Sequence, residues 1–223
     1  MKALLLTGSG RYADPWHPFA ATSSAVAEIL RAAGWVVDES TEVESALATI
    51  GDDVDLLVTN IGRPTDDDSD ATNRAGDGLA RFANRGGSVL ALHSSLNAFA
   101  ANPVWGQLLG ARWVPGVSMH PPQSVARIHV DGSSDVIAGL KDFDVDDELY
   151  TQLVFEADVV PLLTYEFDDG IHPLAWQREH DGSRIVVDAL GHGPESWASA
   201  GHRQFLERCL DWLTPNLRGP ERR

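Results

Sequence analysis

The chain has 223 residues, a mass of 24.1 kDa and a hydrophobic fraction of 43%, enough to bury one sizeable core. With 17 basic against 33 acidic residues, the formal charge of −16 disfavours nucleic acid and anionic membrane surfaces as partners, because both attract clustered Lys and Arg. The single cysteine, Cys209, excludes an internal disulfide and any metal site made of thiolates alone. The apolar start ends at Thr7 without a signal-peptide pattern, and no apolar run approaches the ~18 residues of a membrane span, so we expect a cytoplasmic protein.

The first half of the chain alternates short apolar runs with stretches of helical periodicity, which is typical of a parallel sheet covered by helices. A helix is predicted over 26–33, where apolar residues recur at helical spacing, and a second around Leu79 and Phe82. The polar segment 63–77, with aspartates at 66–68, lacks the spacing of an EF-hand calcium loop and is expected to be a solvated surface loop. Strands are predicted at 3–6, 35–37, 54–58 and 88–92.

The second half is less regular. Strands are expected at 125–130 and 159–165, and the runs 174–178 and 184–190 resemble a hairpin joined through His180-Asp181-Gly182. A last helix carries one apolar face, made of Phe205, Leu206, Cys209, Leu210 and Leu213. We therefore predict one α/β domain over 1–214 and a C-terminal tail at 215–223.

The first predicted strand is followed by Gly8-Ser9-Gly10-Arg11-Tyr12-Ala13, which fits the G-x-G-x-x-G/A pattern of dinucleotide-binding turns. That mechanism needs a helix that opens directly after the glycines, so that its N–H groups face the pyrophosphate. Here Pro15 and Pro18 intervene, and the periodic helix begins only after Phe19. We therefore expect a loop with another role, and neither a nucleotide nor a flavin as cofactor.

The fourth predicted strand is followed at once by His93, at the position where a strand-turn-helix unit can expose a nucleophilic Ser or Cys. Cys209 lies instead on the apolar face of the last helix, where a small buried hydrophobe is expected, so thiol-based amidotransfer is not predicted. Ser94 and Ser95 follow His93 directly, which leaves a serine hydrolase as an alternative, although no glycines flank them in the G-x-S-x-G manner.

Some histidines stand where open α/β sheets bind ligands, in loops beyond the carboxyl ends of strands. Together with the carboxylate of Glu148, imidazoles suit a divalent transition metal, or general acid–base work near neutral pH. No short motif such as H-E-x-x-H is present, so a metal site and hydrogen-bonded structural histidines both stay open. The histidines singled out are His17, His93, His120 and His192, whereas His129, His180 and His202 are interpreted as structural or solvated.

From Leu4 to about Trp212 the chain resembles the ThuA-like (trehalose-utilisation) family. The resemblance implies the class I glutamine amidotransferase-like, flavodoxin-related fold, an α/β sandwich with a mostly parallel central sheet flanked by helices. It also implies that His93 replaces the amidotransferase cysteine at the strand end. The motifs that carry the resemblance are the glycine-containing loop that reaches His17, the stretches 86–93 and 108–113, His120-Pro121, Asp147-Glu148-Leu149-Tyr150, Pro173-Leu174-Ala175-Trp176, and Leu190-Gly191-His192 with Trp197.

Members of the family are associated with disaccharide or keto-sugar metabolism, so the resemblance implies a carbohydrate-processing hydrolase or isomerase with a His/Glu cleft. A non-catalytic sugar-binding or regulatory module on the same fold is the alternative. The net charge of −16 favours a neutral sugar over a sugar phosphate. A homo-oligomer is left open.

Each expected site residue has a role. The catalytic groups are His93, Glu148 and His192. A divalent metal, with zinc as the first choice, is expected to be held by His93, His120, Glu148 and His192. The sugar is expected to contact His17, Tyr150 and Trp197, since aromatic faces pack on the C–H face of a sugar, and ordinary core packing is the alternative for Trp197.

Overall fold

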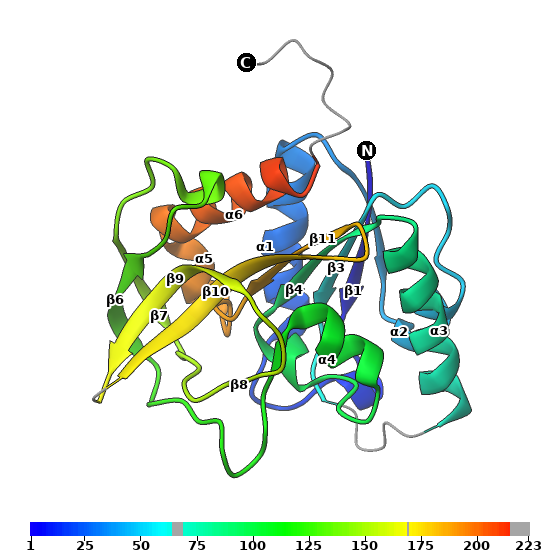
Figure 1. Cartoon of the computed structure of the whole chain (residues 1–223), viewed down its shortest axis with the longest axis horizontal. Helices are drawn as coiled ribbons and strands as arrows, with labels where there is room; N and C mark the ends of the chain where they lie inside the picture. Colours follow the sequence, from blue (N-terminus) through cyan, green and yellow to red (C-terminus); the bar gives the residue numbers. More distant parts are fainter. Residues whose placement is uncertain (64–68, 169, 215–223) are drawn as a thin grey trace.

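The computed structural model describes residues 1–63, 69–168 and 170–214. Its centre is a nine-stranded sheet in the order β2-β1-β3-β4-β11-β10-β9-β6-β7, with helices on both faces (Figure 1). The predicted tail at 215–223 and the aspartates at 66–68 lie outside the described residues. None of the helices in these ranges is long and apolar enough to cross a bilayer.

The strands β2, β1, β3, β4 and β11 pair in parallel, and every later pair in the order is antiparallel. Within this sheet β6 and β10 therefore run opposite to the other strands, and β9 and β7 regain the common direction. A short separate sheet pairs β5 (Ala111–Arg112) with β8 (Val154–Phe155). The strands of the large sheet are β1 (Lys2–Thr7), β2 (Val36–Ser40), β3 (Leu56–Asn60), β4 (Ser88–Leu92), β6 (Ser124–Val130), β7 (Phe143–Asp147), β9 (Val160–Phe167), β10 (Gly170–His180) and β11 (Ser183–Asp188).

Two apolar cores lie on the two faces of the sheet because successive side chains of a strand point to opposite faces. In β1, Ala3 and Leu5 belong to the core under α1, α5 and α6, whereas Leu4 and Leu6 belong to the core under α2, α3 and α4. The helices are α1 (Phe19–Ala32), α2 (Val43–Ala48), α3 (Asp70–Asn84), α4 (Pro103–Leu109), α5 (Pro194–Ala198) and α6 (Ala200–Trp212), with 3₁₀ turns η1 (Gly10–Tyr12), η2 (His93–Asn97) and η3 (Asp135–Ile137).

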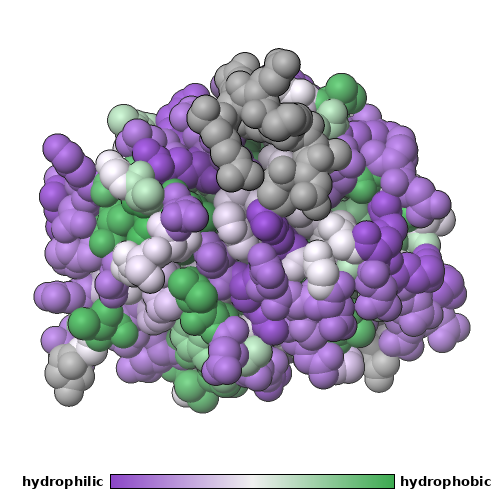
Figure 2. Space-filling view, turned by 45° about the horizontal axis from the view of Figure 1, so that its top comes forward, coloured by the Kyte–Doolittle hydropathy of each residue, from purple (hydrophilic) through white to green (hydrophobic). Residues whose placement is uncertain are grey.

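The outer surface matches the acidic, polar composition. The face in Figure 2 is mostly hydrophilic, with small and separate hydrophobic patches. Among the described large hydrophobic side chains, Trp16 is the most exposed, at 73%.

Several predicted elements are confirmed. The strand at 88–92 has the predicted bounds, and α6 buries Phe205, Leu206, Cys209 and Leu210. The hairpin β10–β11 turns through Asp181 and Gly182, whose φ angles of 49° and 84° fit the type I′ turn that Asp-Gly favours. After the glycine loop the chain forms η1, and α1 begins only at Phe19, so the helix does not open at the glycines.

The prediction of a surface loop over 63–77 is wrong for its second part, because α3 begins at Asp70. Ser69 caps this helix by accepting a hydrogen bond from the Thr72 N–H. The buried face of the first turns consists of small or polar residues such as Thr72 and Ala75, which hide the helical period from a hydrophobicity pattern. The strand β7 was not predicted either, because one of its buried positions is the carboxylate Asp147.

The topology brings four loops to one edge of the sheet. The strands β1, β4, β11 and β7 share one direction, so their carboxyl ends face the same way. Among the described residues, the β6–β7 pair joins the sheet at His129–Thr164 and Val130–Leu163 alone, and β7 packs against α5 and α6. Although β7 is the far edge strand of the sheet, its carboxyl end can therefore reach the loop after β11.

Candidate functional site

A cavity of about 890 Å³ opens at this edge of the sheet. Ligands of open α/β sheets bind beyond the carboxyl ends of the strands, which is where this cavity lies. Its lining comes from the loops after β1, β3, β4 and β7, from the segment after β5, and from the loop after β11. The lining residues are Ala13, Asp14, Pro15, Trp16, His17, Arg63, Ser94, Asn97, Trp113, His120, Glu148, Tyr150 and His192.

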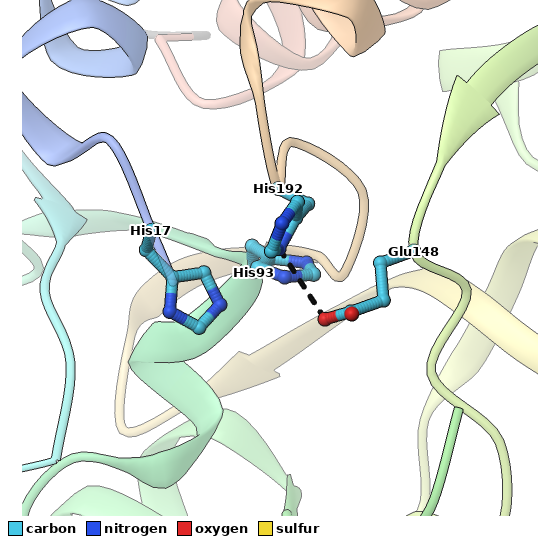
Figure 3. Close-up of side chains that lie close together, drawn as sticks. All are labelled: His17, His93, Glu148 and His192. Atoms are coloured by element: carbon cyan, nitrogen blue, oxygen red, sulfur yellow. Dashed lines mark ion pairs between the residues drawn. The ribbon is translucent and has the colours of Figure 1, made fainter. Parts of the chain in front are cut away.

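Four side chains form a compact group in this region: His17, His93, Glu148 and His192. One nitrogen or oxygen atom from each lies within 4.8 Å of the corresponding atoms of the other three, so the group can hold a metal ion. Figure 3 shows the four side chains directed toward a common centre from separate segments of the chain. The imidazole centroids lie 4.8 to 5.4 Å apart.

His93 enters the group from a strained turn. It follows β4 directly and opens η2, with φ at 39°, a left-handed conformation that costs a non-glycine residue about 1–3 kcal/mol. This is the sharp strand-to-helix turn on which related architectures display a nucleophile, here occupied by an imidazole. The position predicted for His93 is confirmed, and its side chain is almost completely buried.

The outer nitrogens of two imidazoles are held by neighbouring groups. The Nδ1 of His93 lies 2.7 Å from the Ala189 carbonyl oxygen, so it carries the proton and donates it. The Nδ1 of His17 lies 2.8 Å from both carboxylate oxygens of Asp14, to which it donates in the same way. Each contact fixes the ring and leaves Nε2 as a lone-pair nitrogen, the arrangement that metal-binding histidines adopt.

The inner nitrogens have no such partner. Within the described part of the chain, the Nε2 atoms of His17 and His93 and the Nδ1 of His192 are buried and make no hydrogen bond. Buried polar atoms are nearly always hydrogen-bonded, so the two Nε2 atoms of His17 and His93, beside the Nδ1 of His192 that faces only a carboxylate at 3.3 Å, call for a ligand. Imidazole nitrogens and one carboxylate oxygen are the donor set that zinc accepts.

Glu148 joins two imidazoles. Its Oε2 lies 3.3 Å from the Nδ1 of His192, an ion-pair distance without hydrogen-bond geometry, and its Oε1 lies 3.1 Å from the Nδ1 of His120. Burial by itself raises the pKa of Glu148, but contact with His192 and the nearby imidazole charges outweigh it and lower that pKa. Contact with Glu148 raises the pKa of His192 in turn.

The pKa values of His17 and His93 shift in the opposite direction to that of His192. Burial lowers the pKa of His17, although Asp14 opposes this effect. Burial, followed by the charge of His17, lowers the pKa of His93 well below its usual value. Both rings are therefore neutral at pH 7 and available as ligands without the release of a proton.

Aromatic rings complete the cavity wall. The Tyr150 ring lies 4.2 Å from the His93 ring and 4.5 Å from the Trp113 ring, and burial raises the pKa of its hydroxyl well above the usual value. Trp16 also lines the cavity, and its exposure of 73% places an aromatic face at the solvent side. Sequence reasoning did not select Trp16, Arg63 or Asn97, since a single Trp, Arg or Asn in a loop carries no spacing signal.

The structure rearranges some of the expected roles. His17, expected to contact the sugar, belongs to the four-residue group. His120 lines the cavity and contacts Glu148, but it lies outside that group. Trp197 is not brought to the cavity: it is 3% exposed, belongs to the core under α1 and stacks on His202 at 4.5 Å, which is the core-packing alternative.

The serine alternative finds little support in the geometry. The hydroxyl of Ser94 donates to the Ile61 carbonyl at 3.0 Å, and that of Ser95 donates to the Thr59 carbonyl at 2.9 Å. A nucleophilic serine needs a base that accepts its proton, and in the described structure both hydroxyls are directed to backbone carbonyls instead.

Comparisons with known proteins agree with this architecture. The chain is similar to a ThuA-like protein from Parabacteroides merdae, with 20% identity, a TM-score of 0.76, and coverage of 95% of this chain and 89% of the other. A ThuA-like protein from Bacteroides uniformis has 18% identity, a TM-score of 0.74 and coverage of 95% and 90%. A Salmonella typhimurium protein described as cytoplasmic has 15% identity, a TM-score of 0.61 and coverage of 96% and 99%.

At these identities the solved structures show the shared fold alone. A search of curated protein sequences gave no match. The model of the family described as "Trehalose utilisation" matches residues 2–213, which is nearly the whole chain. The chain therefore belongs to the ThuA, or trehalose utilisation, family.

Proposed function

We propose that this protein is a divalent-metal-dependent enzyme of carbohydrate metabolism that works in the cytoplasm. The observation that carries the proposal is the pair of buried Nε2 atoms on His17 and His93 that make no hydrogen bond, which converge beside the His192–Glu148 ion pair. Membership of the trehalose utilisation family supports a carbohydrate-related role. The cytoplasmic description of the Salmonella typhimurium protein supports the compartment.

The donor set supports zinc as the first choice, and manganese and iron also accept imidazole and carboxylate ligands. His17, His93, Glu148 and His192 would hold such a metal, which would supply Lewis-acid chemistry toward a sugar oxygen. The chain's own contribution is to orient the ligands through Asp14 and the Ala189 carbonyl, and to keep His17 and His93 neutral. Hydrolysis and isomerisation are both reactions that such a site serves.

His120 is suited to move a proton in the same cavity. Its side chain is 35% exposed and its Nδ1 lies 3.1 Å from the Oε1 of Glu148, while Oε2 of the same carboxylate faces His192. An imidazole paired with a carboxylate is a common general acid–base group in enzymes. Glu148 thereby connects the proposed metal ligands to a proposed acid–base group that a sugar hydroxyl can reach.

The cavity supports a neutral sugar as substrate. Its volume of about 890 Å³ lies within the range of small-molecule sites, and Trp16 and Trp113 offer rings for the C–H faces of a sugar, whereas the Tyr150 ring is buried between His93 and Trp113. We also infer that the parallel half of the sheet has the flavodoxin-like fold. The order β2-β1-β3-β4-β11 supports it, because it is the order 2-1-3-4-5 when β11 is counted as the fifth parallel strand.

Metal analysis of the purified protein tests the proposal, with His93→Ala, His192→Ala and His180→Ala compared with the parent. His180 lies at the hairpin turn beside Asp181, outside the cavity, and serves as the matched control. We expect stoichiometric metal in the parent and in His180→Ala and its loss in the other two variants. A parent that stays metal-free after incubation with zinc, manganese and iron would contradict the metal site.

Binding of neutral disaccharides, measured by saturation-transfer NMR, separates the enzyme from the alternative binding module. The enzyme proposal expects sugar binding or turnover to weaken in His93→Ala and to persist in His180→Ala. Unchanged sugar binding in metal-free His93→Ala, without turnover in the parent, would favour a non-catalytic sugar-binding module.

A further inference from the structure

A chain of buried polar side chains lies beneath the site and takes no part in the proposed chemistry. Asp147, Asp188, Ser196 and His202 are each at most 1% exposed, and none of them lines the cavity. Burial of ionisable groups is costly unless they are paired and hydrogen-bonded, so such a cluster requires a structural explanation.

The hydrogen bonds among these four buried side chains show which nitrogens of His202 carry a proton. Ser196 donates its hydroxyl to the Oδ2 of Asp147 at 2.6 Å, so its oxygen is free to accept from the Nδ1–H of His202 at 3.0 Å. The Nε2 of His202 lies 2.8 Å from the Oδ2 of Asp188 and must also donate. His202 is thus a buried imidazolium, in agreement with its raised pKa: burial lowers that pKa, but Asp188, Asp147 and the Ser196 carbonyl, which lies 3.2 Å from Nδ1, together raise it more.

The two aspartates at the ends of this cluster, Asp147 and Asp188, accept hydrogen bonds from the backbone that carries the site residues. The Oδ1 of Asp147 accepts from the N–H of Glu148 at 2.8 Å and from the N–H of His192 at 3.0 Å. Its Oδ2 also accepts from the Gly191 N–H at 2.7 Å. At the other end, the Oδ1 of Asp188 accepts from the Leu190 N–H at 3.1 Å.

This link matters because β7 and β11 are not neighbours in the sheet. Glu148 follows β7 and His192 lies in the loop after β11, so no ladder of backbone hydrogen bonds sets the distance between their side chains. One carboxylate, Asp147, holds the peptide nitrogens of both residues. Supporting groups of this kind orient metal ligands, and their loss weakens metal affinity by about 10–100-fold.

We propose that Asp147, Ser196, His202 and Asp188 form a positioning network that sets the separation of Glu148 and His192 in the site. The inference rests on the proposed function, because the two residues it positions are proposed metal ligands. None of the four network residues lines the cavity or belongs to the group of proposed metal ligands, so they are positioning residues.

A pair of serine variants tests the network. Ser196→Ala removes its central hydroxyl. Ser183→Ala is the matched control, because Ser183 is equally buried and donates to the carbonyls of Ala83 and Gly87 on the opposite side of the fold. Cobalt(II) serves as the probe, with its visible absorption spectrum reporting the geometry of the ligand set and a titration reporting affinity.

We expect Ser196→Ala to bind cobalt about 10–100-fold more weakly than the parent and with an altered spectrum. Ser183→Ala is expected to keep the cobalt affinity and the spectrum of the parent, even if its melting temperature falls by as much as that of Ser196→Ala. Equal affinity and an identical spectrum in Ser196→Ala would overturn the inference, as would an equal loss of affinity in both variants.

Amide hydrogen exchange on the metal-free proteins separates this inference from the proposed function. We expect Gly191 and His192 to exchange at least tenfold faster in Ser196→Ala than in Ser183→Ala. If the parent binds no cobalt, the metal proposal fails, and this exchange result alone decides whether the network holds the loop. Unchanged exchange in Ser196→Ala would refute the network in that case too.

Discussion

Metal binding should raise the melting temperature of this protein, and the rise should require the four proposed ligand residues. The ligand atoms of His17, His93, Glu148 and His192 already lie within 4.8 Å of one another, so little reorganisation opposes binding. A ligand present at 100 times its dissociation constant stabilises the folded state by about 2.7 kcal/mol. For a chain of this size each kcal/mol raises Tm by roughly 2–4 °C, so the shift should be about 5–11 °C.

Differential scanning fluorimetry with and without zinc measures this shift, and each variant is compared with its own metal-free form. His93→Ala removes one of the four proposed ligands and should abolish most of the shift. His180→Ala should keep it in full, because its side chain pairs with Asp181 at a surface turn. A parent shift below about 1 °C, or an equal shift in His93→Ala, would refute the reasoning.

Three further predictions concern the surroundings of the site. Asp14→Asn should weaken zinc binding by about 10–100-fold in isothermal titration calorimetry, because the carboxylate that orients the His17 ring is lost; unchanged affinity would argue against that role. Gly191→Ala should lower the free energy of unfolding in urea more than Gly182→Ala. Both have positive φ, but only at Gly191 would the new Cβ meet a side chain, at 2.8 Å from the Cζ2 of Trp197, and equal losses would contradict this account. In EDTA, the free energy of unfolding of the parent should fall relative to that of His93→Gln as the pH drops below about 6.5, by up to about 1.4 kcal/mol per pH unit. The reason is that His93 takes up a proton in the unfolded chain but, with its lowered pKa, stays neutral where it is buried in the folded protein. Urea unfolding between pH 7.5 and 5 measures it, and a constant difference would disprove the pKa assignment.

Much of the parallel half of the fold could be predicted from local patterns. The buried strands β3 and β4 are continuous apolar runs, and the face of α1 repeats at helical spacing, so each pattern lies within one element. The antiparallel half was harder to predict. In β7 a buried carboxylate, Asp147, interrupts the apolar alternation, and α3 begins on small and polar buried residues.

The candidate site divides in the same way. His93 follows a predicted strand directly, so the sequence by itself determined that an imidazole, and not a thiol, stands at the strand end. Sequence also determined that the only cysteine, Cys209, belongs to the apolar face of the last helix. These conclusions depend on residues that are neighbours in the chain, where spacing alone sets which side of an element a residue faces.

Only the tertiary structure decided which distant residues meet. Glu148 reaches His192 because β7 packs against α5 and α6 and because Asp147 holds the backbones of both residues, a contact across 45 positions of sequence. The same packing placed His17 in the four-residue group, left His120 beside it and buried Trp197 against His202. Local propensity does not encode such contacts, because burial and pairing between segments decide them only once the sheet has formed and its two faces are covered.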